Sequence, residues 1–318
     1  MAARQHFVPQ FYLNNFVDPS SKGYRNPYLW VVDLQNRTIR RKSPKNVAHT
    51  IGFYDWKEVK DRAPSIEFLY SQVEGRVAPI INKLKGHRFE LSSEDRYNLS
   101  IFLGLQLTRV PRFRKASIDA LSKSVQNRIR DLANDDEQLQ TSLKIFNAKN
   151  ERTANTLTVE SIKDSINKKK FTIRHNPDYI LQIILRSGLE FSRIMLTMNW
   201  LFVTTTQEEC FFTSDMPVAL LTPDGKHRKI DFESGCNPEL EIYFPISPSS
   251  ILLLQHKAPE NVVSVDADKV KEINRRIFPT IDRYAFCSSE QQGKWALEQR
   301  ASRTNEAVDD NIHSKQRK

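Results

Sequence analysis

The sequence has few of the residues that form phosphate-binding loops or disulfide frameworks. Only nine of its 318 residues are glycine, and it has no P-loop, G-x-G-x-x-G, G-x-S-x-G, H-E-x-x-H or H-x-H motif. A phosphate cradle built from glycine N–H groups is therefore not expected. The three cysteines, Cys210, Cys236 and Cys287, lack C-x-x-C spacing. This spacing argues against disulfides and against a thiolate zinc site, and we expect the thiols to be reduced.

Long apolar segments are missing as well. No window approaches the ~20 apolar residues that a membrane-spanning helix needs. The first residues also lack the apolar core of a secretory signal. These features predict a cytoplasmic protein with no membrane partner.

Positive charge is in excess. Lys and Arg number 48 against 38 Asp and Glu, giving a formal net charge of +10, and the 39% of hydrophobic residues are enough for a folded core. A basic surface attracts polyanions, so nucleic acid is a possible partner, and the sequence leaves protein partners unknown. The side chains predicted to hold its backbone are Arg40, Arg41, Lys42, Arg112, Arg114, Lys168, Lys169, Lys170 and Arg174.

Apolar periodicity predicts an α+β fold with a helical N-terminal half and a mixed, mostly antiparallel sheet in the C-terminal half. Helical spacing covers residues 9–16, 64–85, 92–110, 111–145, 177–198 and 269–277. A β-hairpin is predicted from residues 28–34 and 37–41, and later strands at 201–205, 210–213, 218–221, 240–244, 251–255 and 283–287.

We predict a single composite domain over residues 1–298, with a helical part to about residue 198 and a β-rich part from about residue 199. Residues 146–176 are interpreted as a loop-like, exposed basic insertion, and residues 299–318 as a disordered tail because they have almost no apolar content.

Two glutamates lie on one side of the helix predicted at 64–85. At about 100° per residue, Glu67 and Glu74 fall within roughly 20° of each other, at the margin of the apolar stripe. Two interpretations stay open. Both carboxylates reach water at the boundary of the stripe, or both point into a cleft.

Gln106 lies in the middle of an otherwise apolar helix face, between Leu99, Leu103 and Val110, and Arg109 follows three residues later. A buried amide needs hydrogen-bond partners. The pair is therefore either a brace between helices or part of a site.

His6 precedes the first predicted helix, and Asp215 follows an apolar strand in a turn, Thr213-Ser-Asp-Met-Pro217. A histidine there caps or packs against the helix, or it acts in a site. Asp215 either caps the turn or presents a carboxylate at a strand end, where sites are often built.

The segment His6-Phe-Val-Pro-Gln-Phe-Tyr-Leu-Asn-Asn-Phe16 resembles the opening motif H-x-x-P-x-x-Y-L-x-x-F of a bacterial family, domain of unknown function 4238. Later segments resemble further blocks of that family in the same order: Lys45-Asn-Val-Ala with Phe53-Tyr54, Glu67 with Glu74, Gln106 to Arg112, Thr213 to Pro217, and Ile273-Asn274. The resemblance covers about residues 4–287. It implies no activity, but it includes the same polar positions that helix and turn spacing select.

The first functional hypothesis is a metal-dependent phosphodiesterase, a nuclease acting on nucleic acid in bacterial defence or stress. Glu67, Glu74 and Asp215 would hold Mg²⁺ or Mn²⁺, because these hard cations prefer carboxylate oxygens. His6 would be a ligand or general base, Gln106 would orient, and Arg109 would clamp phosphate.

Two alternatives stay open. One is a non-catalytic sensor or subunit that binds nucleic acid or phosphate, with the polar cluster as an internal brace. The other is a metal-free nucleotide hydrolase or transferase that uses His6 and the glutamates as acid and base.

Overall fold

The computed structural model describes residues 4–53, 65–149, 158–168, 170–206, 209–222, 239–257 and 259–301. The chain divides into two compact units, Met1–Phe113 with Leu181–Lys318, and Arg114–Ile180. The first unit is thus assembled from both ends of the sequence. The predicted α+β class is confirmed, with helices mostly in the N-terminal half and sheets mostly in the C-terminal half. The predicted composite domain stays a prediction, and most of the predicted disordered tail lies outside the described residues.

The N-terminal segment begins with strand β1 (Arg4–His6) and continues into helix α1 (Gln10–Leu13) and the 3₁₀ turn η1 (Asn14–Phe16). The short helix predicted after Pro9 is therefore present. Tyr12 anchors it, because its ring stacks 5.0 Å from the Phe244 ring and its hydroxyl donates to the Pro245 carbonyl at 2.7 Å. These contacts fix β1 relative to a strand some 230 residues later.

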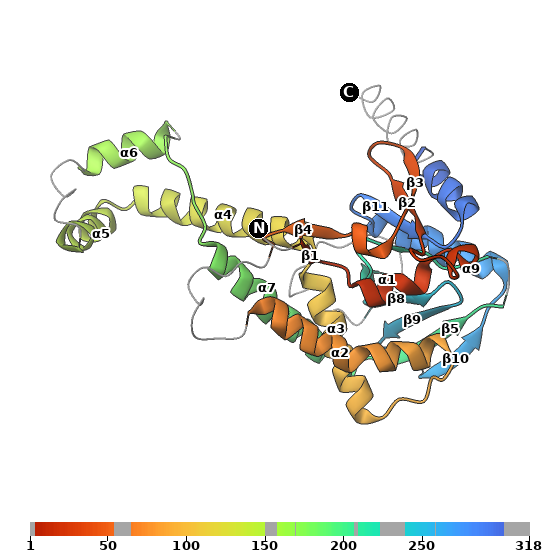
Figure 1. The fold of residues 1–318 in the computed structure, drawn as a ribbon. Coiled ribbons are helices and arrows are strands. Elements are labelled where there is room, and N and C mark those ends of the chain that lie inside the picture. Colours follow the sequence, from red (N-terminus) through yellow and green to blue (C-terminus); the bar gives the residue numbers. More distant parts are fainter. Residues whose placement is uncertain are drawn as a thin grey trace, which may run out of the picture. The chain divides into compact units, whose positions relative to one another are not determined.

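The first unit also contains long helices (Figure 1): α2 (Ile66–Lys85), α3 (Ser93–Thr108) and most of α7 (Pro177–Thr197). Helix α7 belongs to this unit from Leu181 onward. The capping box predicted at Ser92 and Asp95 is present, with the Asp95 N–H donating to Ser92 Oγ at 3.0 Å. Helix α3 approaches α7 closely at Gly104, where a Cβ would lie 2.2 Å from the Gly188 carbonyl oxygen.

The larger sheet has five strands in the order β10-β5-β9-β8-β7. They are β5 (Asn199–Thr204), β7 (Ala219–Leu221), β8 (Glu241–Ser247), β9 (Ser250–Gln255) and β10 (Asn261–Ser264). Neighbouring strands are antiparallel except β10 and β5, which are parallel, so the predicted mixed, mostly antiparallel sheet is confirmed. The edge strand β10 was not predicted.

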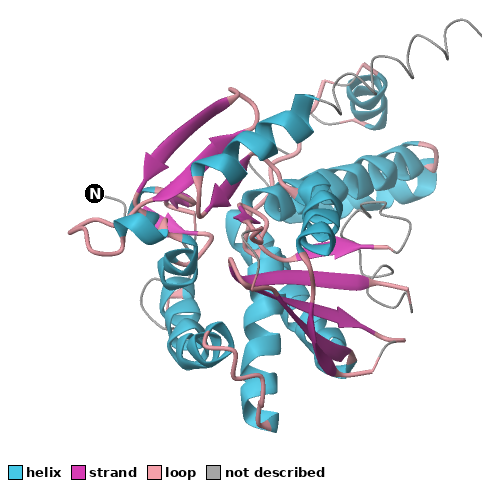
Figure 2. Cartoon of the chain, turned by 90° about the vertical axis from the view of Figure 1, so that its right-hand side faces the viewer, coloured by secondary structure: helices cyan, strands magenta, loops and turns pink. Residues whose placement is uncertain are grey.

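A second, four-stranded antiparallel sheet has the order β3-β2-β11-β6. The predicted hairpin forms β2 (Leu29–Asp33) and β3 (Thr38–Lys42), and it pairs with β11 (Tyr284–Cys287) from the other end of the chain. The strand predicted at 210–213 is reduced to β6 (Thr213–Ser214). The two larger sheets form separate groups of strands in Figure 2.

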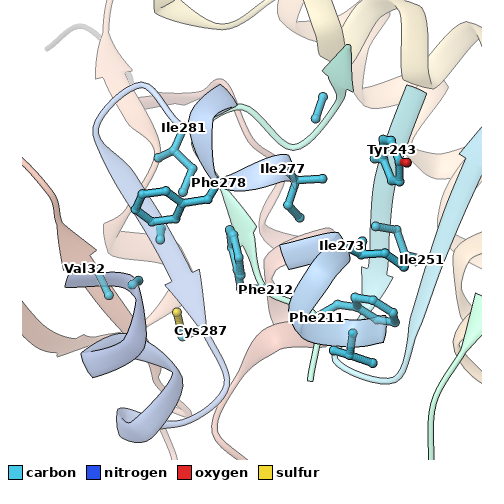
Figure 3. Packing of buried hydrophobic residues seen from close by; sticks show 14 of the residues in the cluster. Val32, Phe211, Phe212, Tyr243, Ile251, Ile273, Ile277, Phe278, Ile281 and Cys287 are labelled. Carbon is cyan, nitrogen blue, oxygen red and sulfur yellow. The ribbon is translucent and has the colours of Figure 1, made fainter. Parts of the chain in front are cut away.

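Helix α9 (Ala267–Ile277) shares one hydrophobic cluster with both larger sheets. The helix contributes Ile273 and Ile277, the five-stranded sheet contributes Tyr243, and the four-stranded sheet contributes Val32 (Figure 3). The 3₁₀ turn η5 (Phe278–Thr280) follows and leads to the turn before β11. This cluster sets the position of the 282–284 turn, which lines a cavity described below.

The second unit is helical. It contains most of α4 (Pro111–Ala133), with α5 (Asp136–Lys149) and α6 (Val159–Asn167). The prediction of a loop-like insertion at 146–176 is wrong where α5 and α6 occupy it. Helix α6 begins with a capping box in which Ser161, not the usual Glu or Gln, pairs with Thr158. In the described part of the chain, no helix is both long and apolar enough to cross a membrane.

Candidate functional site

Two histidines face each other across the smallest sheet. Strand β1 pairs in antiparallel fashion with β4 (His49–Ile51), and the register places His6 directly opposite His49. Their ring centroids lie 5.4 Å apart in an edge-to-face arrangement. Ala48 precedes β4 with φ of 51°, and its carbonyl accepts the Phe7 N–H at 2.9 Å. The left-handed residue and this hydrogen bond close the short sheet, so the imidazoles are held by backbone geometry.

Both imidazoles favour the neutral form. Burial lowers the pKa of His6, and His49 lowers it further, while a backbone hydrogen bond to Lys45 and the Glu74 charge act in the opposite direction. Burial also lowers the pKa of His49, with Arg4 and Lys42 adding to the effect. A neutral imidazole can accept a proton, and two adjacent rings disfavour double protonation. We therefore expect the pair to carry at most one added proton near neutral pH.

Gln106 connects α3 to this strand. Its side chain is only 1% exposed, its Nε2 donates to the Phe7 carbonyl at 3.0 Å, and its Oε1 accepts from Arg109 Nε at 2.8 Å. The predicted Gln106–Arg109 pair therefore exists and is buried. The Phe7 carbonyl belongs to the residue that follows His6, so the amide helps to hold the histidine strand in place.

Arg109 brings α2 into the same network. Its NH1 donates to Glu74 Oε1 at 2.7 Å, and its guanidinium carbon lies 5.0 Å from the centroid of the Tyr70 ring. Glu74 is partly exposed, whereas the Arg109 side chain is 2% exposed. A buried cation needs such a carboxylate, because desolvation without a partner is costly. The Arg109–Glu74 pair thus connects α3 to α2. The charges of both residues act on the pKa of His6.

Glu67 lies in the first turn of α2 and contacts strand β1. Its Oε2 accepts from Gln5 Nε2 at 3.4 Å, a long hydrogen bond, and the residue is exposed. Gln5, His6 and Phe7 are consecutive, and each has a link to a residue predicted for the site: Glu67, Glu74 and Gln106 respectively. The structure therefore brings these predicted residues together around β1.

Asp215 has a different role. Its carboxylate accepts the backbone N–H groups of Asp282 at 3.1 Å, Arg283 at 2.8 Å and Tyr284 at 2.9 Å. Burial raises its pKa to about 7, against the lowering effect of these hydrogen bonds. Asp215 thus fixes the turn that leads into β11, the turn-capping role that the sequence left open.

The predicted metal ligands do not fit one ion. Asp215 uses its oxygens for three backbone donors, and Glu74 is paired with Arg109. Among the described residues, no group of three or more His, Cys, Asp or Glu side chains is placed to hold a metal ion. We therefore derive no chemical step from a metal at Glu67, Glu74 and Asp215.

A cavity of about 350 Å³ adjoins the histidine pair. Its wall contains His49 and Phe7 beside the positively charged Lys42, Arg112 and Arg283. Arg112 is held by donation from NH1 to the Thr280 carbonyl at 3.1 Å, and Arg283 is held by Asp33, with NH2 to Oδ2 at 2.7 Å. Asp215 and Asp282 line the same cavity. Fixed cations beside a histidine form a site suited to an anion.

Comparison with known proteins gives one family. The sequence model described as "Protein of unknown function (DUF4238)" matches residues 4–291. The chain belongs to this family. No curated protein and no solved structure matches the chain. The resemblance that the sequence suggested is therefore confirmed at the level of the DUF4238 family, whose description assigns no activity.

The basic residues predicted for nucleic acid are divided between the two units of this DUF4238 chain. In the first unit, Lys42 and Arg112 line the cavity, and Arg40 is exposed. Arg41 lies on the other face of β3, with its guanidinium carbon 4.7 Å from the Trp30 ring centroid. The predicted residues of the second unit are Arg114, Lys168, Lys170 and Arg174, and Lys169 lies outside the described residues.

His49 is the residue of this DUF4238 site that sequence reasoning missed. Its strand has three residues, too few for a period-2 pattern to be recognised. One signal was present, because the Lys45-Asn-Val-Ala block that resembles the family ends directly before His49.

Proposed function

We propose that the protein binds a phosphodiester of nucleic acid in the cavity beside His49 and cleaves it by acid–base chemistry. One observation carries the proposal. His49 lies in the wall of a cavity with Lys42 and Arg112, and it faces His6 across the β1–β4 pair. The cations supply charge for a phosphate, and the imidazoles supply groups that transfer protons near neutral pH.

The cations act on the phosphate oxygens. Arg112 uses NH1 for the Thr280 carbonyl, and its planar guanidinium has further N–H groups for a phosphate. Lys42 adds a point charge from β3. Together they would offset the negative charge that develops on the phosphoryl oxygens, the main electrostatic demand of phosphoryl transfer.

The histidines act on protons. His49 lines the cavity and is the group that would accept the proton of the attacking hydroxyl, either water or a ribose 2′-hydroxyl. As the hydroxyl oxygen bonds to phosphorus, the bond from phosphorus to the leaving oxygen breaks, and the protonated His49 would return the proton to that oxygen. His6 is a positioning residue, because it touches the ring of His49 and is itself held by the strand that Gln106 fixes. Its lowered pKa keeps it neutral beside a protonated His49.

A metal-dependent form of this function stays a prediction. The Glu67, Glu74 and Asp215 set does not fit an ion, so metal chemistry would need other ligands. A test of cleavage therefore includes Mg²⁺ and Mn²⁺ as well as EDTA.

Binding without turnover is the second candidate. Gln106, Arg109 and Glu74 satisfy one another inside the protein, as expected of a brace. In that case only the cavity cations contact the ligand. Nucleic acid would then bind with steep salt dependence and stay intact.

Cleavage of end-labelled polymers tests the proposal. The full chain is incubated with single- and double-stranded DNA and RNA in EDTA, in Mg²⁺ and in Mn²⁺. We expect cleavage of at least one polymer in EDTA. His49→Ala should lose about 100-fold or more, since general acid–base groups contribute about that factor. His6→Ala should lose less, because His6 positions the ring of His49 and does not transfer the proton.

Two control variants match these substitutions. His256→Ala removes a histidine that does not line the cavity, and Lys22→Ala removes an exposed lysine that does not line it either. Both controls should cleave as wild type does. Wild-type protein that leaves every polymer intact with every metal would rule out the cleavage proposal. Full activity of His49→Ala would show that His49 is not the proton acceptor.

A further inference from the structure

A cavity of about 730 Å³ lies in the second unit, against helices α4 and α6 (Figure 1). It shares no lining residue with the cavity beside His49. Part of its wall is helix α4, where Ser122, Gln126 and Arg130 recur every four residues and therefore lie on one face of the helix. The rest of the wall comes from the end of α6 and from residues 171–173. We call this the α4 cavity.

Hydrogen bonds hold the segment 171–175 at both ends. Before it, the Lys170 N–H donates to the Ser165 carbonyl of α6 at 2.8 Å. At its other end, His175 Nε2 lies 2.7 Å from Ser122 Oγ of α4 in a hydrogen bond. The segment itself is neither helix nor strand. These two bonds therefore determine where its side chains lie on α4.

Phe171 is an aromatic side chain that stays accessible in this wall. It lines the α4 cavity and is 38% exposed. Ile166 and Ile173 line the same cavity and are half-buried. Three apolar side chains thus come together at an accessible surface, and an aromatic ring there can stack on another flat ring.

The polar part of the wall consists of amides and one cation. Gln126, Asn134 and Asn167 are exposed and line the cavity with Arg130. No carboxylate of the described residues lines it. An amide both donates and accepts hydrogen bonds, so these side chains match the mixed donors and acceptors at the edge of a nucleobase. The wall therefore suits a flat, polar-edged group that is joined to an anion.

Positive charge continues around Phe171. Lys170 and Arg174 are close to it in the sequence, and both are exposed, as is Arg130. Among the described residues these three form no ion pair, whereas Lys168 pairs with Asp164. Exposed cations around an accessible ring are the combination by which proteins bind single-stranded nucleic acid, because the cations hold phosphates while the ring stacks on a base.

We propose that the α4 cavity binds an unpaired base of a single-stranded nucleic acid, stacked on Phe171, with the adjoining phosphates held by Arg130, Lys170 and Arg174. Every base has a flat face, so this binding tolerates any sequence. A duplex keeps its bases paired and stacked, and it offers this surface only its phosphates. The inference rests on the nucleic acid partner of the proposed function and deepens it, because it makes the single-stranded form the one that the second unit selects.

A strand without bases tests the proposal. Labelled oligothymidylate of about twelve nucleotides is compared, by fluorescence anisotropy, with an abasic strand that has the same number of phosphates. The protein is the full chain carrying His49→Ala, which removes the proposed proton acceptor, so that binding is measured apart from cleavage. We expect oligothymidylate to bind at least about tenfold more tightly than the abasic strand, because stacking of one base contributes about that factor.

Substitutions of Phe171 locate the effect. Phe171→Ala should bind both strands alike, and its affinity for a thymidylate–adenylate duplex should stay unchanged. Phe171→Trp keeps an aromatic ring and should keep the preference for the strand with bases. The matched control is Phe146→Ala, because Phe146 is 43% exposed in the same unit and does not line the cavity. This control should bind as the protein with Phe146 does.

Equal affinity for oligothymidylate and the abasic strand when Phe171 is present would overturn the proposal, even if Phe171→Ala does not fold. Equal losses in Phe171→Ala and Phe146→Ala would overturn it as well. Polyglutamate that displaces the labelled strand as readily as unlabelled oligothymidylate does would identify a surface for acidic peptides and contradict it. A preference for bases, together with no cleavage by the wild-type protein, would support this inference and contradict only the cleavage proposal.

Discussion

Arg109 is a buried cation whose guanidinium forms an ion pair with the partly exposed carboxylate of Glu74. Glu74→Gln keeps the shape of the side chain and removes its charge, so the buried guanidinium loses this ion pair and stays desolvated. We expect the free energy of unfolding to fall by about 3 kcal/mol, the usual cost of breaking a buried pair from one side. Urea unfolding of the variant measures it.

The matched control is Glu190→Gln, which breaks the exposed pair of Glu190 with Arg193. An exposed pair contributes roughly 0–1 kcal/mol, so this variant should unfold almost as wild type does. Similar decreases in the free energy of unfolding for both variants would show that the Arg109–Glu74 pair is no more stabilising than an exposed ion pair.

Asp215 should make stability fall as pH rises. Burial raises its pKa to about 7, whereas an unfolded Asp titrates near ~3.9. Between these values the folded protein holds a proton that the unfolded chain has released, so the stabilisation present at low pH is lost as pH rises through about 7. Asp215→Asn cannot titrate and lacks this dependence.

The measurement is urea unfolding of both proteins at several pH values from roughly 4.5 to 7.5. The stability difference between wild type and Asp215→Asn should shrink by a few kcal/mol over this range, since each unit is worth about 1.4 kcal/mol. Histidine titration cancels in the difference because both proteins share it. A stability difference that does not change with pH would show that burial does not raise the pKa of Asp215.

At the scale of elements, the contact between α3 and α7 depends on Gly104. A Cβ there would lie 2.2 Å from the Gly188 carbonyl oxygen and 2.7 Å from the Ser192 nitrogen, and both are backbone atoms. Gly104→Ala must therefore push two helices apart. We expect stability to fall by about 3 kcal/mol or more, at or beyond the upper range for overpacking, with a lower melting temperature.

Gly75→Ala is the control on α2. A Cβ there meets nothing within 4 Å, and the residue is exposed in a helix. Alanine should stabilise by about 0.5–1 kcal/mol through helix propensity. A Gly104→Ala protein as stable as wild type would show that the helices are not in close contact.

Long elements could be predicted from the sequence because their patterns repeat. The spacing of apolar residues in α2 and the Ser92–Asp95 capping box in α3 each specify local structure. Strands β1, β4 and β10 could not be predicted, because three or four residues carry no clear period. The pairing of β2 with β11 could not be predicted either, since it joins segments about 250 residues apart.

The site was also predictable only in part, because its local patterns show in the sequence and its contacts between distant segments do not. Gln106 is conspicuous as an amide on an apolar face, and its burial is confirmed. Its convergence with His6 and Glu74 depends on tertiary contacts with the Phe7 carbonyl and, through Arg109, with Glu74, and sequence spacing does not reveal such contacts. The carboxylate of Asp215 looked like a metal ligand, whereas the turn at 282–284 uses it as a hydrogen-bond acceptor.

At the scale of the whole molecule, the excess of positive charge predicts a general affinity for nucleic acid. The formal net charge is +10, and exposed Lys168, Lys170 and Arg174 belong to the second unit, whereas the proposed cleavage residues belong to the first. Replacing these three by alanine should weaken binding about equally for all sequences. The slope of log affinity against log salt should fall by roughly 0.9 for each phosphate that the variant no longer neutralises.

Filter binding of labelled DNA and RNA at several salt concentrations measures this slope. The rate of cleavage at saturating protein should stay unchanged, since His49 and its cavity are intact. An unchanged slope would show that these cations do not bind the nucleic acid backbone, and a lower cleavage rate would show that the second unit takes part in the chemistry.

The most direct test of the central claim is the titration of His49 by NMR, with His49→Ala to assign its ring signal. Without ligand, its pKa should lie below about 6.5, the usual histidine value. A non-cleavable dinucleotide phosphorothioate in the cavity should raise this pKa, because a neighbouring anion favours the protonated ring. A His49 pKa that does not change at saturating dinucleotide would contradict phosphodiester binding at this site.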